Sequence, residues 1–117
     1  MLAGCGGGEE ENGTPGSQAD QVAAGQSLYA QSCAKCHGDK GQGGTGPIVI
    51  GGSKRIASYQ TTQRLYDYVS RTMPFDAPGS LTPDQYWNVI AYLLDENQLL
   101  PEDTVLGPDS ETITLER

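Results

Sequence analysis

The sequence has few of the residues that usually build metal sites and hydrophobic cores. Its 117 residues include one histidine, three cysteines, two methionines, one phenylalanine and one tryptophan. A single histidine excludes any site that needs two histidine ligands from the same chain. Basic residues are also scarce, with 7 lysines and arginines against 15 acidic residues, and the net charge of −8 disfavours nucleic-acid binding. No apolar run is long enough for a transmembrane helix.

The composition divides the chain into three parts. Residues 1–16 are mostly glycine, glutamate and polar residues, and residues 101–117 carry five acids, one arginine and two prolines. Residues 17–100 are nearly neutral, with seven acids and six basic residues. We expect a flexible tether over 1–16, one folded domain over 17–100 and an acidic extension over 101–117. The acidic ends favour solubility, and a sharper hypothesis is docking to a basic face of a partner.

Three helices are predicted between residues 17 and 100. Ser17 is a suitable N-cap for the first helix, which runs up to Cys33. The second spans about 62–72 and leads directly into Met73 and Pro74. Apolar and small residues recur at helical spacing along both helices: Val22, Gly25, Tyr29 and Ser32 in the first, and Leu65, Tyr68, Val69 and Thr72 in the second.

The third helix has the strongest start signal. Thr82 can cap it, Pro83 suits the first helical position, and Gln85 completes a capping box. The predicted inner stripe of this helix is Tyr86, Val89, Ile90, Leu93 and Asn97. Because Gly25 has no side chain, we expect the first and third helices to cross there, near Tyr92.

Two thiols and the histidine stand together in the segment CAKCHG, at Cys33, Cys36 and His37. A zinc site needs four ligands, and the remaining cysteine, Cys5, lies far away in a glycine run. A redox dithiol of the thioredoxin type follows a β-strand, whereas a helix is predicted before Cys33. In covalent haem attachment both thiols bond the haem vinyl groups and the next residue, His, reaches the iron. The motif therefore predicts one haem c.

A haem iron needs a second ligand opposite His37. Because the chain has no other histidine, methionine is the next candidate. Met1 is at the start of the chain, whereas Met73 lies between a helix and a proline-rich loop. Pro74 favours an extended backbone at Met73, which would let a loop carry the sulfur over the iron. The alternative is that Met73 only fills the core. An iron ligated by His and Met has no open position for substrate, so we expect electron transfer and no enzymatic activity.

A haem would also explain the thin core of the domain. The 84 residues from 17 to 100 contain one Phe, one Trp and six Tyr, which is little apolar bulk for a domain of this size. A buried porphyrin would supply the missing apolar mass. The same composition would also suit a marginally stable peptide-binding module.

Cys5 ends the segment LAGC, which resembles a bacterial lipobox, the site where a signal peptide is removed and the cysteine receives a lipid. A polar, glycine-rich leader follows it, as a tethered domain requires. We expect Cys5 to be a lipid anchor, and the alternative is a leftover cysteine in a disordered end. From Cys5 to Asp20 a flexible chain reaches roughly 20 Å, enough to sample partners near a membrane.

Taken together, these motifs resemble class I monohaem cytochromes c. The resemblance rests on GQSLY at 25–29, CAKCHG at 33–38, the glycine loop GQGGTGP at 41–47, Met73 with Pro74, and the last helix. It implies a small all-α fold with about three main helices around one covalent haem. It also implies that the backbone carbonyl of Pro47 orients the second ring nitrogen of His37.

A narrower resemblance concerns the segment RTMPFDAPGSLT at 71–82, with AYLL at 91–94. It is similar to bacterial cytochromes that serve periplasmic dehydrogenases, including sulfite-oxidising ones. In these proteins a segment like 100–106 follows the last helix, which implies that residues 101–117 wrap over the surface. A further proline-rich motif that such relatives often carry is absent here.

The expected function is electron transfer at the outer face of the bacterial cytoplasmic membrane, in the periplasm. Donors would be a dehydrogenase or a quinol-oxidising complex, and the acceptor a terminal oxidase. One alternative is a permanent cytochrome subunit of a periplasmic dehydrogenase complex. Another is a haem enzyme or gas sensor in which Met73 is not a ligand. No small-molecule substrate is expected.

Overall fold

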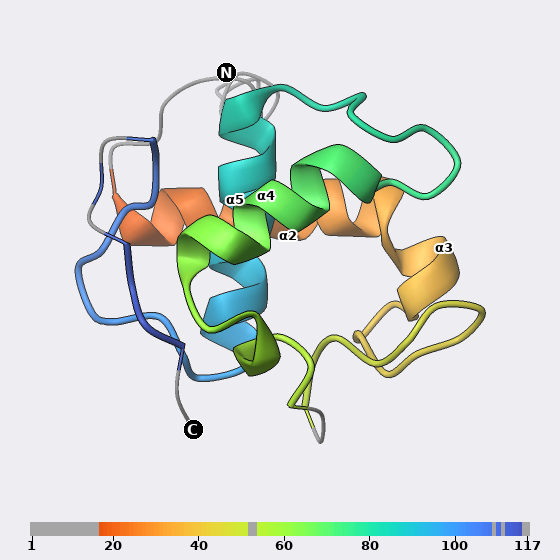
Figure 1. Ribbon diagram of the computed structural model, residues 1–117, viewed down its shortest axis with the longest axis horizontal. Helices are drawn as coiled ribbons and strands as arrows, with labels where there is room; N and C mark the ends of the chain where they lie inside the picture. Colours follow the sequence, from red (N-terminus) through yellow and green to blue (C-terminus); the bar gives the residue numbers. More distant parts are fainter. Residues whose placement is uncertain (1–16, 52–53, 109, 111, 116–117) are drawn as a thin grey trace, which may run out of the picture.

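The computed structural model describes residues 17–51, 54–108, 110 and 112–115. These residues form four α-helices and one short 3-10 helix (Figure 1), which are α2 (Gln18–Ser32), α3 (Ala34–His37), η1 (Ala57–Tyr59), α4 (Thr62–Thr72) and α5 (Pro83–Glu96). Extended pairing among them is limited to one isolated antiparallel bridge between Thr61 and Thr114. The predicted all-α fold is confirmed. Cys5 and the tether over 1–16 lie outside the described residues.

Each long helix begins at a local capping signal. The Ser17 hydroxyl accepts a hydrogen bond from the Asp20 amide, and the Thr61 hydroxyl accepts one from the Arg64 amide. At α5 both halves of the capping box between Thr82 and Gln85 are formed. These contacts satisfy amides that have no partner inside the helix, which is why the starts of α2 and α5 could be predicted from sequence; the Thr61 cap of α4 was not predicted.

Helices α2 and α5 cross in direct backbone contact at Gly25. A Cβ atom built on Gly25 would lie 1.9 Å from the Asn88 carbonyl oxygen and 2.9 Å from the Tyr92 Cβ. The predicted crossing is confirmed, and only glycine permits it at this separation. Beside it the rings of Tyr29 and Tyr92 pack with centroids 5.4 Å apart.

The apolar face of α5 forms most of the core. Tyr86, Val89, Ile90 and Leu93 of the predicted stripe are all buried. Asn97 is buried too, but it lies just beyond the helix as its C-cap. The Asn97 amide nitrogen donates to the Val49 carbonyl over 2.8 Å, and its oxygen accepts from the Gly51 amide over 3.0 Å. Asn97 therefore ties the end of α5 to the loop that follows the glycine-rich segment.

Helix α4 lies across α2 and α5 in Figure 1 and ends at Met73. Leu65 is buried on its inner face. Tyr68, predicted on the same face of the helix, lines the same cavity as Leu65 and Val69 but is 42% exposed. Its ring stands against Tyr59, with centroids 5.2 Å apart, at the edge of this cavity.

The segment after α5 runs back over α2 and reaches the start of α4. Leu106 and Leu115 are buried in the core, although the segment is acidic overall. Gln21 of α2, which is fully buried, holds Leu106 by both backbone groups, at 3.0 Å to its carbonyl and 2.8 Å from its amide. Farther along, the Leu115 amide donates to the Gln60 carbonyl over 2.8 Å. The segment thus joins α2 to the N-terminal end of α4.

Candidate haem site

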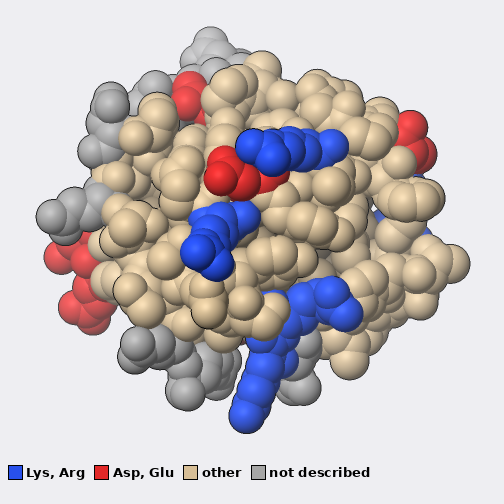
Figure 2. Space-filling view, in the orientation of Figure 1, with Lys and Arg blue, Asp and Glu red and all other residues tan. Residues whose placement is uncertain are grey.

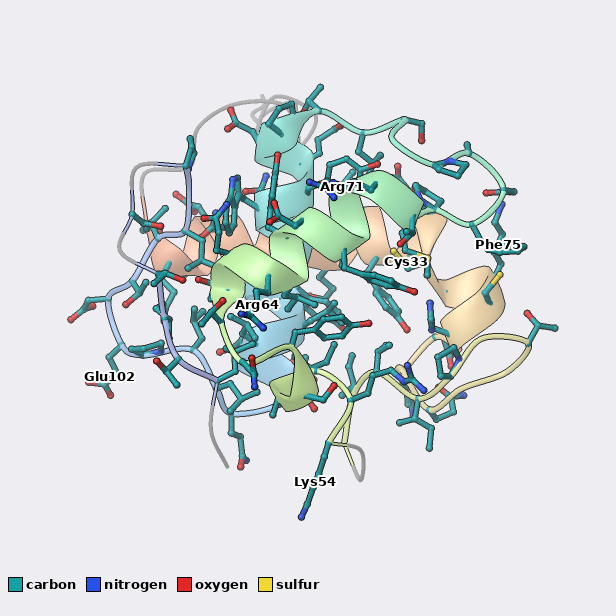
Figure 3. All side chains as sticks on the ribbon, in the orientation of Figure 1. Cys33, Lys54, Arg64, Arg71, Phe75 and Glu102 are labelled. Atoms are coloured by element: carbon teal, nitrogen blue, oxygen red, sulfur yellow. The ribbon has the colours of Figure 1, made fainter. Side chains whose placement is uncertain are left out.

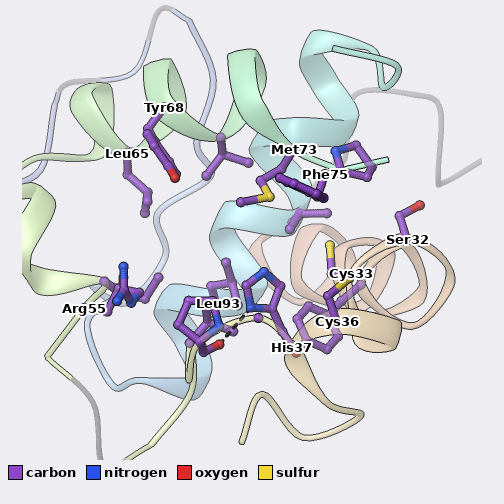
Figure 4. A pocket seen from close by; sticks show the side chains of 18 of the residues that line it. Ser32, Cys33, Cys36, His37, Arg55, Leu65, Tyr68, Met73, Phe75 and Leu93 are labelled. Carbon is purple, nitrogen blue, oxygen red and sulfur yellow. Dashed lines mark hydrogen bonds between the residues drawn. The ribbon is translucent and has the colours of Figure 1, made fainter. Parts of the chain in front are cut away.

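A cavity of about 400 Å³ lies between α3, α4 and α5 (Figure 4). The residues of the CAKCHG segment form one side, and Leu65, Val69 and Met73 form the facing side. Val89 and Leu93, one turn apart on α5, contribute aliphatic side chains between them. Most of the surface that lines the cavity is apolar.

The two cysteines and the histidine reach the cavity from one helical turn. Cys33 ends α2 and begins α3, and Cys36 and His37 follow on α3. Sequence patterns predicted the end of the first helix here but not this separate turn. Neither thiol is in a disulfide. Burial, with a smaller effect from Cys36, raises the pKa of the Cys33 thiol to about 11, so the chain alone keeps it protonated at neutral pH.

His37 is oriented by the loop that faces it. Its Nδ1 lies 2.8 Å from the carbonyl oxygen of Pro47, drawn as a dashed line in Figure 4. A carbonyl can only accept, so Nδ1 carries the hydrogen and Nε2 keeps a free lone pair. Gly46 makes the approach possible, because a Cβ there would lie 2.9 Å from His37 Cε1. The loop therefore selects the tautomer that can bind a metal through Nε2.

Backbone hydrogen bonds close the glycine-rich loop onto the CAKCHG turn. The Gly46 amide donates to the Cys36 carbonyl over 2.7 Å, and the Gly43 amide donates to the His37 carbonyl over 2.6 Å. The Tyr29 hydroxyl donates to the Gly38 carbonyl over 2.7 Å. Burial raises the pKa of Tyr29 to about 12, which keeps it a hydrogen-bond donor. Both ends of the turn are thus anchored.

Met73 enters the cavity from the opposite side. It is the C-cap of α4, and its amide donates to the Val69 carbonyl over 2.9 Å. Its backbone is extended, with φ −121° and ψ 153°, as the following proline predicts. In Figure 4 the Met73 sulfur and the His37 ring point into the cavity from facing sides.

Polar groups gather at one end of the cavity. Arg55 and Tyr59 both line it, in the segment that precedes α4. Trp87 does not line the cavity: its ring is buried and stacks on Tyr66 at 4.2 Å, among the core residues. Tyr68 of α4 stands beside Tyr59 at this end.

An ion pair that was not predicted from the sequence joins the two sides of the site. Lys35, inside the CAKCHG segment, pairs with Asp76, three residues after Met73. Each group shifts the other's pKa toward the charged form: the pKa of Lys35 is raised and that of Asp76 is lowered. Both side chains are 57% exposed, so the pair is screened by solvent. It links the turn that carries His37 to the loop that carries Met73.

These residues fit a covalent haem. Two thiols and an imidazole lie on one side, a thioether lies on the other, and the space between is apolar, as a porphyrin requires. The guanidinium of Arg55 adds a positive charge at one end, where haem carboxylates need donors.

Comparison with known proteins gives a family match over most of the domain. Residues 20–93 match the family described as "Cytochrome C oxidase, cbb3-type, subunit III". The matched region contains most of α2, the CAKCHG turn, α4, Met73 and most of α5. No helix among the described residues has the length and hydrophobicity needed to cross a membrane.

Two larger proteins contain a similar region. A thiosulfate dehydrogenase of Stutzerimonas stutzeri is 32% identical over an 80-residue alignment that covers 62% of this chain and 26% of that protein. The crystal structure of the sulfane dehydrogenase SoxCD from Paracoccus pantotrophus contains a chain with 34% identity and a TM-score of 0.60. That match covers 80% of this chain and 48% of the other. The chain thus spans about a quarter and about half of the two relatives.

Proposed function

Because the chain belongs to the family described as cytochrome c oxidase, cbb3-type, subunit III, and is an electron carrier with one covalently bound haem c, we propose that His37 and Met73 are its axial iron ligands. The observation that carries the proposal is the placement of the two side chains on facing sides of one apolar cavity (Figure 4). The small cytochrome c fold is shown by the match to the SoxCD chain. When bound, the haem supplies a one-electron couple.

The other parts of the site have matching roles in this proposal. Cys33 and Cys36 form the thioether bonds, which fixes the haem against α3 and brings His37 to the iron. The Pro47 carbonyl holds the His37 ring and increases its basicity as a ligand. Arg55 and Tyr59 would hold the haem carboxylates at the polar end of the cavity. With His37 and Met73 both bound, the iron would have no open position for a substrate, and the Met73 thioether would raise the reduction potential.

We propose redox proteins as partners, with a dehydrogenase or quinol-oxidising complex as donor and a terminal oxidase as acceptor. Both relatives are named as dehydrogenases and extend well beyond the region matched here. A sulfur-compound dehydrogenase is therefore a specific candidate donor. A lipid on Cys5, with the periplasmic side of the membrane as location, completes this hypothesis, because the tether would keep the carrier near membrane complexes.

The surface over α4 suggests how a partner would be recognised. Figure 2 shows several basic side chains on this face with an acidic group beside them, and Figure 3 labels Arg64 and Arg71 at α4 and Lys54 in the loop before η1. All three are exposed. An acidic partner face would be attracted here even though the whole chain carries −8.

Electron exchange by the purified holoprotein tests the carrier function. The protein should accept one electron per haem from membranes or dehydrogenase preparations that contain its donor, and return it to an oxidase. The reaction with an acidic partner should slow as salt is added, because the interaction with the basic face is screened. Rapid turnover of a small molecule by the isolated holoprotein would instead favour an enzyme.

The permanent-subunit alternative makes a different prediction. Such a subunit should co-purify with a catalytic subunit in constant ratio during gel filtration of native extract. A free carrier should elute alone, at the size of the monomer or of its detergent-bound lipidated form. Both results are compatible with ligation by Met73, so this experiment separates the two ways of delivering electrons without testing the site.

A further inference from the structure

The loop that carries Met73 has little core packing of its own. It spans the nine residues from Met73 to Leu81, between the end of α4 and the N-cap of α5. Pro74 is buried, whereas residues 75–80 are exposed, and Phe75 is 79% exposed. In Figure 3, Phe75 lies at the edge of the molecule. Something other than burial must therefore fix the loop over the cavity.

One buried hydroxyl closes this loop at its base. The Tyr86 hydroxyl donates to the Met73 carbonyl over 2.7 Å. The same oxygen lies 3.4 Å from the Leu81 amide, which donates to it. The first and last residues of the loop are thus held by a single side chain of α5. Gly79 adds a weaker contact, with its amide 3.3 Å from the Met73 carbonyl.

The position of that hydroxyl is itself well fixed. Tyr86 is 2% exposed, and its ring packs edge-on against Tyr66 at 6.4 Å. Tyr66 in turn stacks on Trp87. Tyr86 also lies in the first turn after the Thr82 cap, where α5 is stabilised by its capping box. A buried tyrosine in these surroundings has little freedom to follow the loop if the loop moves.

Met73 therefore has both backbone polar groups committed. Its amide is bound to α4 through Val69, and its carbonyl is bound to α5 through Tyr86. The Lys35–Asp76 pair is a second link, but it is exposed and sensitive to salt, whereas the Tyr86 hydrogen bond is partly buried and comes from a buried side chain. Of the two, the Tyr86 contact is the stronger constraint on the Met73 backbone.

We propose that Tyr86 is a positioning residue for the iron ligand: its hydroxyl holds the Met73 loop closed, so that the thioether stays over the haem and resists displacement. The proposal rests on Met73 being the axial ligand, as argued above. Tyr86 acts through the backbone of Met73 and does not line the cavity. Its loss should thus weaken the Met73 bond to iron without changing the way the haem is attached.

The test compares Tyr86→Phe with wild type as ferric holoprotein, using imidazole as the competing ligand. Imidazole must displace Met73, so its apparent affinity reports how firmly Met73 is held. Losing one partly buried hydrogen bond should raise that affinity about five- to tenfold and lower the reduction potential. Tyr66→Phe is the matched control, since it removes a hydroxyl from the neighbouring ring of the same aromatic cluster and should change the affinity by less than about twofold.

The measurements distinguish a failure of the Tyr86 proposal from a failure of the Met73 assignment. If Tyr86→Phe lowers the unfolding midpoint but leaves imidazole affinity and potential at wild-type values, Tyr86 is only a core residue and the proposal is wrong. If Met73→Ala binds imidazole no better than wild type, Met73 is not the axial ligand, and the underlying assignment is wrong independently of Tyr86. If Tyr86→Phe does not yield holoprotein, amide hydrogen exchange of the wild type tests whether Tyr86 holds the loop. The Leu81 amide should exchange at least about tenfold more slowly than exposed amides of the loop, and equal rates would overturn the proposal.

Discussion

Replacing Gly25 by alanine should strongly destabilise the protein, although the same change in an ordinary helix is stabilising. In a helix interior alanine is favoured over glycine by about 1 kcal/mol. At Gly25, however, the new Cβ would lie 1.9 Å from the Asn88 carbonyl oxygen and 2.6 Å from the carbon of that carbonyl. Both atoms belong to the backbone of α5, so no side-chain rotation relieves the contact.

The magnitude follows from how far the helices must separate. A normal contact requires more than 1 Å of additional distance, and overpacking of this kind costs about 3 kcal/mol at the upper end of its usual range. The shift also breaks the hydrogen bond between Gln21 and Asn88, now 3.2 Å long, for about 1 kcal/mol more. After subtracting the gain in helix propensity, we expect a net loss of about 3 kcal/mol, or roughly 10–15 °C in the unfolding midpoint.

Thermal and guanidinium unfolding of the holoprotein, followed by circular dichroism, measure this loss. Ser27→Ala is the matched control, because Ser27 is exposed on the same helix and gains helix propensity without a new contact. The control should be neutral or slightly stabilised. If Gly25→Ala behaves like Ser27→Ala, the close crossing of α2 and α5 is wrong.

Three further changes probe other contacts. Gln21→Met should lower the free energy of unfolding in guanidinium by about 2–4 kcal/mol, because both backbone groups of Leu106 lose their partner. The control Gln26→Met, on the exposed face of the same helix, should be nearly neutral, and equal effects would contradict the role of Gln21 in holding the C-terminal segment. Gly46→Ala should lower the free energy of unfolding by about 1–3 kcal/mol, because the new Cβ would lie 2.9 Å from the His37 ring. Gly107→Ala is the control: a Cβ there would have no neighbouring atom within 4 Å, so its stability should stay near that of the wild type. Tyr29→Phe should be less stable than wild type at neutral pH, because the hydrogen bond to Gly38 is lost. Burial raises the pKa of the folded Tyr29 to about 12, so this stabilisation is fully present below the unfolded value of 10.0 and should shrink as pH rises from 10 toward about 12; a constant difference in equilibrium unfolding over that range would contradict the raised pKa.

The helices could be predicted because their signals are local. Ser17 and Thr82 cap amides within three residues, and Gly25 permits a close approach wherever it is placed. Long-range partners have no such signal. Gln21 is a polar residue on an early helix, and only the fold shows that Leu106, 85 residues away, completes its hydrogen bonds. The acidic composition of 101–117 similarly concealed that Leu106 and Leu115 are buried.

In the candidate haem site, too, the residues with a local sequence signal could be predicted and the long-range contacts could not. The CAKCHG spacing predicted the haem, and the scarcity of histidines and methionines predicted Met73 as the second iron ligand. The structure brings these side chains to one cavity. Their bonds to the haem stay predictions. Tyr86 was expected only as part of an apolar stripe. Its hydroxyl partner at Met73 could not be predicted, because helical periodicity places a side chain on a face without saying what its polar end contacts. The Lys35–Asp76 pair, 41 residues apart, was missed for the same reason.

The central claim is that Met73 completes the iron opposite His37. The most direct measurement is the red and near-infrared absorption and magnetic circular dichroism of the ferric holoprotein at neutral pH, for wild type and Met73→Ala side by side. The account predicts a low-spin wild type with a methionine-to-iron charge-transfer band, which disappears in Met73→Ala as the iron becomes high-spin or binds an external ligand. A high-spin wild type, or a band that persists in Met73→Ala, would contradict it.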